Sequence, residues 1–514
     1  MHRVLHSKIK MKKTLIILSA ITLPLDAKEI TFTEHVAPII FHNCTSCHRP
    51  GEAGPFTLMN YNDVRKRGKL IARVTEERVM PPWHARKGSF KYHGDRRLTE
   101  EQINILSQWV ETGSLEGDPA KLPAIPKFVS GWQLGKPDLI LKMTEAFSVP
   151  ADGRDIYRSF VIPLNLPSDK WLKAIEFRPD ARTVVHHCLF SYDTTGEARR
   201  LDRSEKQPGF RRMRRQGRGM GSLGGWAVGG QPNRLPADLA WQLPKSADLV
   251  LAMHYHPSGK PEQDQSTVGL YFTDQPPRTA FTGVQLPPVF GAISGVDIPA
   301  GEKAYTLKDS FVLPIDVEAF GVSAHAHYLG KVLRMRATTP KGKVLNLLNI
   351  SDWDFSWQEQ YQFEEFVSLP KGTKLESTVI WDNSAQNPNN PNVPPKRVRW
   401  GPESDDEMGS LTLLCRPASG ERFSTLTSTY RRHISEVSTR TARERANRVQ
   451  GANADKVLNT FLKRTDRNGN GKIELGEAPR WLKAAFERSD TNGDKTLDFN
   501  ELKAATERLR NRNR

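Results

Sequence analysis

Three close pairs of histidines in the central part of the chain limit its fold more than any other feature. Residues 101–432 contain no histidines besides His186 and His187, His254 and His256, and His325 and His327. Each pair lies in strand-like sequence: "TVVHHCLF", "LVLAMHYHP" and "AFGVSAHAHYLGKVLRMR". Residues two apart in a strand share a face, so such a pair can present both imidazoles to one ion. The pattern predicts antiparallel β structure that carries one or two transition-metal sites.

The adjacent pair needs a special backbone. Neighbours in a regular strand face opposite ways, so His186 and His187 can share an ion only at a bulge or a strand end. Imidazole-rich sites suit copper, zinc, iron or nickel. The alternative is three unrelated pairs of buried histidines.

The length and composition predict several domains. The chain has 514 residues, which is enough for about three or four domains. Its 35 prolines and 37 glycines favour many short strands and turns. Beyond about residue 430 proline almost vanishes and helix formers dominate, so a different domain is predicted there.

The first residues resemble an export signal. "MKKTLIILSAITLPLDA" has two lysines, an apolar run and a small residue, Ala27, as the cleavage edge. We therefore expect residues 1–27 to be a signal peptide and the mature protein to be periplasmic or secreted in a bacterium. No later stretch reaches the roughly 20 apolar residues of a membrane span, so no transmembrane anchor is expected. A buried N-terminal helix is the alternative.

Positive charge gathers between Arg199 and Arg218. The net charge is +17, and this stretch holds nine basic residues against two acidic ones. An exported chain rarely needs nucleic acid, so no nucleic-acid partner is expected. The run is interpreted as a solvated loop, or as a docking patch for an acidic partner.

The motif "CTSCH" is the signature of covalent haem attachment. Cys44 and Cys47 can add to the haem vinyl groups, and His48 can bind the iron. A zinc site or a disulfide is the alternative. Downstream, "RVMPPWHA" offers Met80 or His84 as the second iron ligand, and Met80 is favoured because a thioether suits electron transfer. The segment "LTEEQINILSQWVETG" predicts a helix that closes a cytochrome c-like domain, residues 29–118.

Two twelve-residue loops near the other end follow the calcium-binding pattern of an EF-hand, within a helical pair at residues 455–508. In the second loop Lys495 replaces the turn glycine, which puts calcium binding there in doubt. A solvated helical hairpin is the alternative. The predicted ligand positions are Asp466, Asn468, Asn470, Lys472, Glu474 and Glu477 in the first loop, and Asp490, Asn492, Asp494, Thr496, Asp498 and Glu501 in the second.

Between about residues 135 and 425 the chain resembles the copper type II, ascorbate-dependent monooxygenases, which include the peptidylglycine and dopamine monooxygenases. The matching motifs are the adjacent "HH", the "HY" at His254, "HxHxLGK" at His325, and "DEM" ending at Met408. The resemblance implies two packed jelly-roll domains, residues 135–285 and 286–425, with one copper in each.

By position, the resemblance implies that His186, His187 and His254 bind an electron-storing copper. It implies that a second copper, which activates dioxygen for attack on a substrate C–H bond, is bound by His325, His327 and Met408. A thioether ligand there suits Cu(I). His256 matches no family ligand and is expected to be structural or to support a ligand.

The departures from the family pattern concern the substrate. Peptide-amidating members have an arginine, an asparagine and a tyrosine where this chain has Ser323, Ser410 and Thr412. Loss of an arginine removes a bidentate contact to a carboxylate, so a peptide C-terminus is not expected as the substrate. Cys188 and Cys415 could form a disulfide in an oxidising compartment or could be two buried thiols.

The sequence thus predicts a mainly β, multidomain protein with two jelly-roll domains, a small helical haem domain and an EF-hand pair. Its expected cofactors are two copper ions, one haem c, and one or two calcium ions. The expected activity is copper-dependent hydroxylation of a small organic molecule with O2. Electrons are expected from an external donor, an ascorbate-like reductant or a redox protein, through the haem. A non-enzymatic electron carrier or copper-binding protein is the alternative.

Overall fold

The structure is a computed structural model that describes residues 29–52, 54–128, 131–211, 219–228, 230–236 and 238–512. The predicted signal peptide and residues 212–218 of the basic run lie outside these residues. The chain divides into two compact units, one of Met1–Pro81 with Arg97–Lys127 and one of Pro82–Arg96 with Phe128–Arg514. Residues 82–96, which fall within the predicted 29–118 domain, thus belong to the second unit.

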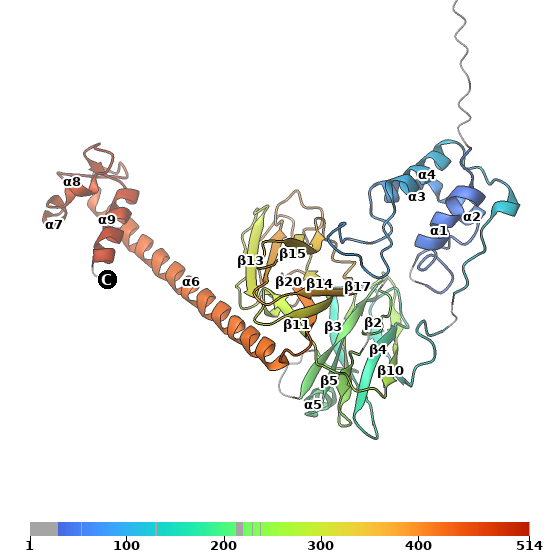
Figure 1. The fold of residues 1–514 in the computed structure, drawn as a ribbon. Coiled ribbons are helices and arrows are strands. Elements are labelled where there is room, and N and C mark those ends of the chain that lie inside the picture. The colour runs from blue at the N-terminus through green and yellow to red at the C-terminus, as the bar shows by residue number, and fades with distance from the viewer. Residues whose placement is uncertain are drawn as a thin grey trace, which may run out of the picture. The chain divides into compact units, whose positions relative to one another are not determined.

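The first unit is helical (Figure 1). Its elements are η1 (Phe32–Val36), α1 (Ala37–Asn43), α2 (Tyr61–Lys66), α3 (Gly68–Glu76), α4 (Glu100–Glu111) and η2 (Pro119–Lys121). The predicted closing helix is α4, and Thr99 and Gln102 form a capping box at its start. Ile103, Leu106 and Trp109 of α4 are buried in the core of this unit.

The second unit begins with two four-stranded antiparallel sheets, ordered β1-β10-β4-β7 and β3-β8-β5-β6, and the smaller pair β2-β9. The two four-stranded sheets share one hydrophobic core, which includes Phe177 and Leu251. The strand β8 is buried along most of its length, so it suits the interior of its sheet. The elements are β1 (Leu139–Lys142), β2 (Phe147–Val149), β3 (Ile156–Pro163), β4 (Lys170–Arg178), β5 (Val185–Asp193), α5 (Glu197–Ser204), β6 (Met220–Ala227), β7 (Trp241–Leu243), β8 (Asp248–Tyr255), β9 (Glu262–Asp264) and β10 (Thr267–Thr273).

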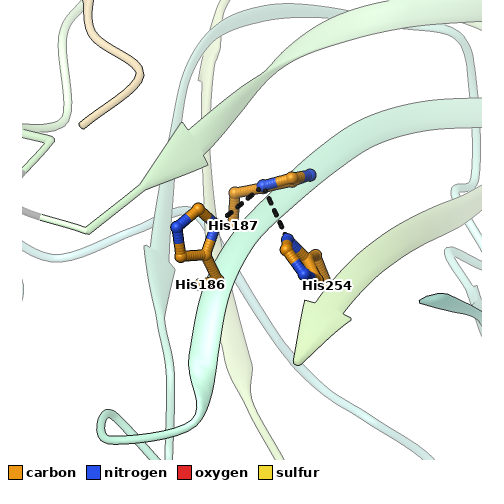
Figure 2. A group of neighbouring side chains, drawn as sticks. All are labelled: His186, His187 and His254. Atoms are coloured by element: carbon orange, nitrogen blue, oxygen red, sulfur yellow. Dashed lines mark hydrogen bonds between the residues drawn. The ribbon is translucent and has the colours of Figure 1, made fainter. Parts of the chain in front are cut away.

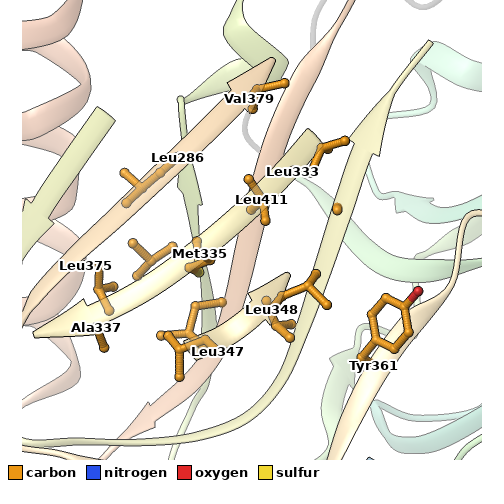
Figure 3. Close-up of a cluster of buried hydrophobic side chains, with 14 of the residues drawn as sticks. Leu286, Leu333, Met335, Ala337, Leu347, Leu348, Tyr361, Leu375, Val379 and Leu411 are labelled. Carbon is orange, nitrogen blue, oxygen red and sulfur yellow. The ribbon is translucent and has the colours of Figure 1, made fainter. Parts of the chain in front are cut away.

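Two further four-stranded antiparallel sheets follow, ordered β11-β20-β14-β17 and β13-β18-β15-β16, with the pair β12-β19. Figure 3 shows part of their shared core, where Leu333, Val379 and Leu411 are among the buried side chains. The elements are β11 (Thr282–Leu286), η3 (Val289–Gly291), β12 (Asp297–Ile298), β13 (Tyr305–Val312), β14 (Val317–Ala326), β15 (Gly330–Thr338), β16 (Val344–Ile350), β17 (Gln360–Leu369), β18 (Lys374–Trp381), β19 (Val398–Arg399) and β20 (Gly409–Pro417).

Residues 82–96 pack on this second pair of sheets. Ala85 and Tyr92 form isolated antiparallel bridges with Ile350 and Phe363, and the hydroxyl of Tyr92 donates to the carbonyl of Leu347 at 2.5 Å. The segment therefore belongs to the β structure, although it follows the predicted haem ligand directly in sequence.

The C-terminal part is helical, with a short strand pair joining its two loops. Its elements are α6 (Phe423–Thr465), β21 (Ile473–Glu474), α7 (Arg480–Lys483), α8 (Phe486–Ser489), β22 (Thr496–Leu497) and α9 (Phe499–Arg512). Ile473 pairs with Leu497, and both side chains are buried. Among the described residues, no helix combines the length and the apolar composition that crossing a bilayer requires. The described chain is mainly β with antiparallel sheets, as the sequence predicted.

Candidate metal centre

Three imidazoles converge where β5 begins and β8 ends (Figure 2). His187 of β5 pairs with His254 of β8, and the register of the two strands shifts between Val185 and His187. This irregularity is what the adjacent histidines were predicted to need. The Nδ1 atom of His187 lies 3.2 Å from Nδ1 of His186 and 3.3 Å from Nδ1 of His254.

These separations fit a shared metal ion. Imidazole nitrogens bound at about 2.0–2.1 Å in tetrahedral geometry lie about 3.3 Å apart. Burial lowers the pKa of His186 to about 3, and the neighbouring His254 adds to the shift. Burial also lowers the pKa of His187 well below its ordinary value. Both imidazoles are therefore neutral near pH 7, which is the form that binds a metal.

Asp155 supports this cluster from its far side. Its carboxylate accepts from Nε2 of His254 and from Nδ1 of His256, both at 2.8 Å, and from the Ser404 hydroxyl at 2.6 Å. Burial alone would raise the pKa of Asp155, but the hydrogen bonds from His254 and Ser404 lower it. With its Nε2–H held by Asp155, His254 presents the Nδ1 lone pair to the cluster.

The contact with Asp155 gives His256 a supporting position, since it shares a carboxylate with His254. Asp155 itself was not predicted from the sequence. It stands 99 positions before His254, and nothing in its local sequence marks it.

The second predicted cluster lies at the end of β14. In the register of β14 with β20, His325 pairs with Ser410 and Ala326 pairs with Gly409. Met408 immediately precedes β20, so the same register places it beside His327. Nδ1 of His325 contacts Oε1 of Gln358 at 2.6 Å, and Nδ1 of His327 contacts the carbonyl of Asp406 at 3.1 Å. Each ring therefore has its Nε2 left to bind an ion, and the ring centroids are 5.2 Å apart.

Burial keeps this second pair neutral as well. It lowers the pKa of His325 to about 4, although the hydrogen bond to Gln358 acts in the opposite direction. Burial together with the neighbouring His325 lowers the pKa of His327 to about 3.

Glu407 fixes the backbone around this pair, and sequence reasoning did not single it out as a functional residue. Its fully buried carboxylate accepts hydrogen bonds from the backbone N–H groups of His327 and Leu329 at 3.1 and 2.6 Å. It also accepts from Nε1 of Trp381 at 2.9 Å and from N–H of Met408 at 3.2 Å. Burial raises the pKa of Glu407 to about 8, and the four donors act against that shift. One carboxylate thus fixes the backbone of both His327 and Met408.

A single aromatic ring links the two clusters. The ring centroid of Phe355 lies 5.2 Å from that of His186 and 5.4 Å from that of His327. Phe355 follows β16 and is buried. The predicted clusters, which come from different pairs of sheets, therefore approach each other across one side chain. The sequence did not predict this approach.

The predicted haem-binding residues Cys44, Cys47 and His48 lie in the first unit, directly after α1. The backbone N–H of His48 donates to the carbonyl of Cys44 at 2.9 Å, and Nδ1 of His48 contacts the carbonyl of Phe56 at 3.1 Å. This contact leaves Nε2 of His48 for an iron ion. Burial raises the pKa of the Cys44 thiol to about 12. Met80 belongs to the same unit, whereas the alternative ligand His84 belongs to the second unit.

Both predicted calcium loops are tightly turned. The carboxylate of Asp466 accepts from the N–H groups of Gly469 and Gly471 at 2.7 and 2.8 Å. In the second loop, carboxylate oxygens of Asp490, Asp494 and Glu501 lie within 4.8 Å of one another. The predicted ligand positions Asn468, Asn470, Glu474, Glu477, Asn492, Thr496 and Asp498 lie in or directly beside the turns of these two loops.

The turn position of the second loop is strained, as its lysine suggested. Lys495 has φ +61°, where the first loop has Gly471 at +80°. A residue with a Cβ atom adopts this conformation at a cost. In addition, Nζ of Lys472 lies 2.7 Å from a carboxylate oxygen of Asp494, so a lysine of the first loop forms an ion pair with an aspartate of the second loop.

Cys188 and Cys415 are free, buried thiols. They lie in the cores of different pairs of sheets, so the disulfide that the sequence left open is absent. In the basic run, Arg199 pairs with the buried carboxylate of Asp248 and Arg200 pairs with Glu197. At least part of that run is therefore bound to the β structure.

No protein-family model matches the chain, and no curated protein matches it. A crystal structure of the infectious bursal disease virus VP2 subviral particle is 9% identical, covers 57% of this chain and 74% of that chain, and has a TM-score of 0.18. A structure of PNGF-II is 9% identical, covers 54% of this chain and 65% of that chain, and has a TM-score of 0.23. These likenesses are too weak to bear on fold or function.

Proposed function

We propose that the protein is an exported, copper-dependent monooxygenase that hydroxylates a C–H bond of a small organic molecule with O2. The observation that carries this proposal is the pair of neutral imidazole clusters that meet at Phe355. One presents three Nδ1 atoms at metal-sharing distances. The other presents two Nε2 atoms next to Met408.

The donor set of the second cluster fits copper better than zinc. Two imidazoles with a thioether form a soft, neutral set that favours Cu(I), and zinc sites rarely include methionine. Bound copper would supply the one-electron chemistry needed to activate O2. We further propose that each pair of sheets is a jelly-roll domain, as the family resemblance implies.

The residues around the clusters would orient and insulate them. Asp155 and Gln358 hold the imidazoles in one tautomer each, and Glu407 fixes the backbone at His327 and Met408. Phe355 keeps the space between the clusters apolar. Such outer contacts determine ligand orientation and metal affinity.

We propose that Cys44, Cys47, His48 and Met80 hold a haem c that delivers electrons to this site from an external donor. The free Nε2 of His48 and the two thiols in one unit with Met80 support this assignment. We also propose that the C-terminal loops bind calcium in a structural role, because carboxylates converge in the second loop and the first follows the same sequence pattern.

Metal analysis and oxygen uptake test the proposal. We expect two coppers and one haem per chain, and O2 uptake by the reduced protein with a suitable metabolite. Labelled oxygen should then be found in the product. Copper binding without uptake for any compound of a broad panel would favour the alternative, a non-enzymatic haem and copper electron carrier.

The role of the haem is tested separately. Rapid mixing should show that reduced haem reoxidises through the copper sites, and a Cys44→Ala/Cys47→Ala variant should lose turnover with its natural donor. Full turnover of this variant with ascorbate alone would show that the haem is not needed as a relay.

A further inference from the structure

Two consecutive residues beside the second cluster have a strained backbone. Val289 and Phe290 both have φ +52°, in the left-handed region that β-branched and bulky residues avoid. Hydrogen bonds hold this conformation: N–H of Phe290 donates to Oε1 of Gln285 at 3.1 Å, and Nε1 of Trp400 donates to its carbonyl at 3.2 Å. Strain that is fixed in this way is common at ligand-binding sites.

The strained residues carry exposed apolar side chains. Val289 is 48% exposed and Phe290 is 36% exposed. The ring of Phe290 lies 5.2 Å from that of His325, at 78° to it. An apolar surface therefore flanks the imidazole that faces the proposed dioxygen site.

The sheet face that carries His325 is uncharged over three successive rows. One row crosses all four strands through Gln285, Thr412, Ser323 and Gln360. The row before it consists of Gly283, Leu414, Gly321 and Gln362. The row after it has His325 opposite Ser410, with Gln358 bonded to His325.

Small side chains leave the backbone of this sheet face thinly covered near His325. Within these three rows, the positions on β14 and β20 hold glycine, serine and threonine, apart from His325 and Leu414. The next row along the same face holds the charged pair Glu318 and Arg416. The opposite face of the same strands carries the core residues Leu286, Leu411 and Tyr361 (Figure 3). Ser410 is buried, so this face offers the half-buried hydroxyls of Ser323 and Thr412 and the amides of Gln285 and Gln360 beside an apolar edge.

We propose that this face binds an uncharged, partly apolar substrate, whose apolar part packs on Phe290 while a hydroxyl, carbonyl or amide group bonds to the row from Gln285 to Gln360. This inference rests on the proposed function, since it names the substrate class of that site. No side chain in these three rows offers a charged partner, so an ammonium group would lose hydration without compensation, and a carboxylate would meet only the charge of the bound copper.

The test compares three probes of similar shape and different charge: benzamide, benzoate and benzylammonium. Binding is followed by ligand-observed NMR on the full chain, copper-loaded, reduced and anaerobic, so that no turnover occurs. We expect benzamide to bind about tenfold more tightly than either charged probe. Phe290→Ala should weaken benzamide binding about tenfold, because an aromatic contact is lost.

Val344→Ala is the matched control, since Val344 is an exposed apolar residue of the same sheets, 52% exposed. It should leave binding unchanged. Copper content and circular dichroism of each variant show whether the site and fold persist, and Phe290→Leu provides a milder variant if Phe290→Ala unfolds.

Failure of benzamide to bind, tighter binding of a charged probe, or an unchanged affinity in the folded Phe290 variants would each overturn the proposal. Selective benzamide binding without substrate-dependent O2 uptake would support this inference while contradicting the proposed activity. The two failures are therefore distinguishable.

Discussion

At the scale of single residues, the proposed copper sites depend on side chains that contact the metal-binding histidines and do not bind the metal themselves. Asp155 is the clearest case, because one carboxylate contacts His254, His256 and Ser404. The hydroxyls of Ser404 and Tyr157 are also hydrogen-bonded to each other, and the ring of Tyr157 stacks on His254 at 4.4 Å. Asp155 therefore links a proposed ligand of the first pair of sheets to a loop of the second.

Replacing Asp155 by asparagine should weaken copper binding at the first cluster about 10- to 100-fold, because one neutral amide oxygen replaces two charged acceptors and holds the tautomer of His254 less firmly. Competition with a Cu(I) chelator measures the change. His256→Gln is the control: it alters a contact to the same carboxylate but removes no ligand, so a much smaller effect is expected. Equal losses in both variants would contradict the assigned role of Asp155.

The buried histidines make the stability of the metal-free protein depend on pH. The pKa values of His186 and His327 are lowered to about 3 and that of His325 to about 4. In the unfolded chain they return to about 6.5. Between these limits the unfolded state binds more protons, so the free energy of unfolding falls as the pH falls below about 6.5, by about 1.4 kcal/mol per pH unit for each histidine.

Urea unfolding of the metal-free protein between pH 7 and pH 5 checks this slope. The variant His327→Gln lacks one of these histidines, so its stability should decline less steeply, by about 1 kcal/mol per pH unit averaged over this range. Identical slopes would mean that His327 is not held neutral in the folded state.

At the scale of elements, the end of β14 and the start of β20 form one unit around Glu407. Glu407→Gln keeps the size of the side chain but turns an acceptor oxygen into an N–H2 donor that faces N–H groups. Above about pH 8, where Glu407 is ionised, we expect a loss of about 2–3 kcal/mol in the free energy of unfolding, together with weaker copper binding at His325 and His327. Chemical denaturation and copper titration measure the two effects.

The control for this variant is Glu403→Gln, an exposed position on the same loop. It should change neither quantity. An unchanged stability of Glu407→Gln would show that the four hydrogen bonds contribute little.

The sequence predicted features that depend on residues close together in the chain, and it did not predict contacts between residues far apart in the chain. Local signals gave α4 with its Thr99 cap, and the irregularity at His186 followed from two adjacent histidines in a strand. The supports were not predictable, because Asp155 and Glu407 act on residues 99 and 80 positions away. The same holds for Phe355, whose contacts depend on how the two pairs of sheets pack.

At the scale of the whole molecule, residues 82–96 belong to the unit that carries the proposed dioxygen site, although they follow a proposed haem ligand in sequence. The segment begins two residues after Met80. His84 has a buried Nε2 without a hydrogen-bond partner among the described residues. It borders a cavity of about 10 Å³ that Gln358, the partner of His325, also lines. A single water molecule needs about this much room.

Arg96 holds the far end of this segment. It pairs with the largely buried Glu359 at 2.5 Å, and its guanidinium lies 5.1 Å from the ring centroid of Trp83. Arg96→Met removes both charged contacts, at a cost of about 1 kcal/mol. Local opening of residues 82–96 should therefore increase about fivefold, which amide hydrogen exchange measures.

If electron transfer from the proposed haem depends on this segment, Arg96→Met should also slow the reoxidation of reduced haem in rapid mixing, while haem and copper contents stay unchanged. The matched control is Arg86→Met. Arg86 lies in the same segment, and its replacement removes an exposed hydrogen bond to Ser351. It should leave both measurements close to those of the unaltered protein. Faster hydrogen exchange with an unchanged reoxidation rate would show that electrons reach the copper sites by a route that does not depend on this segment.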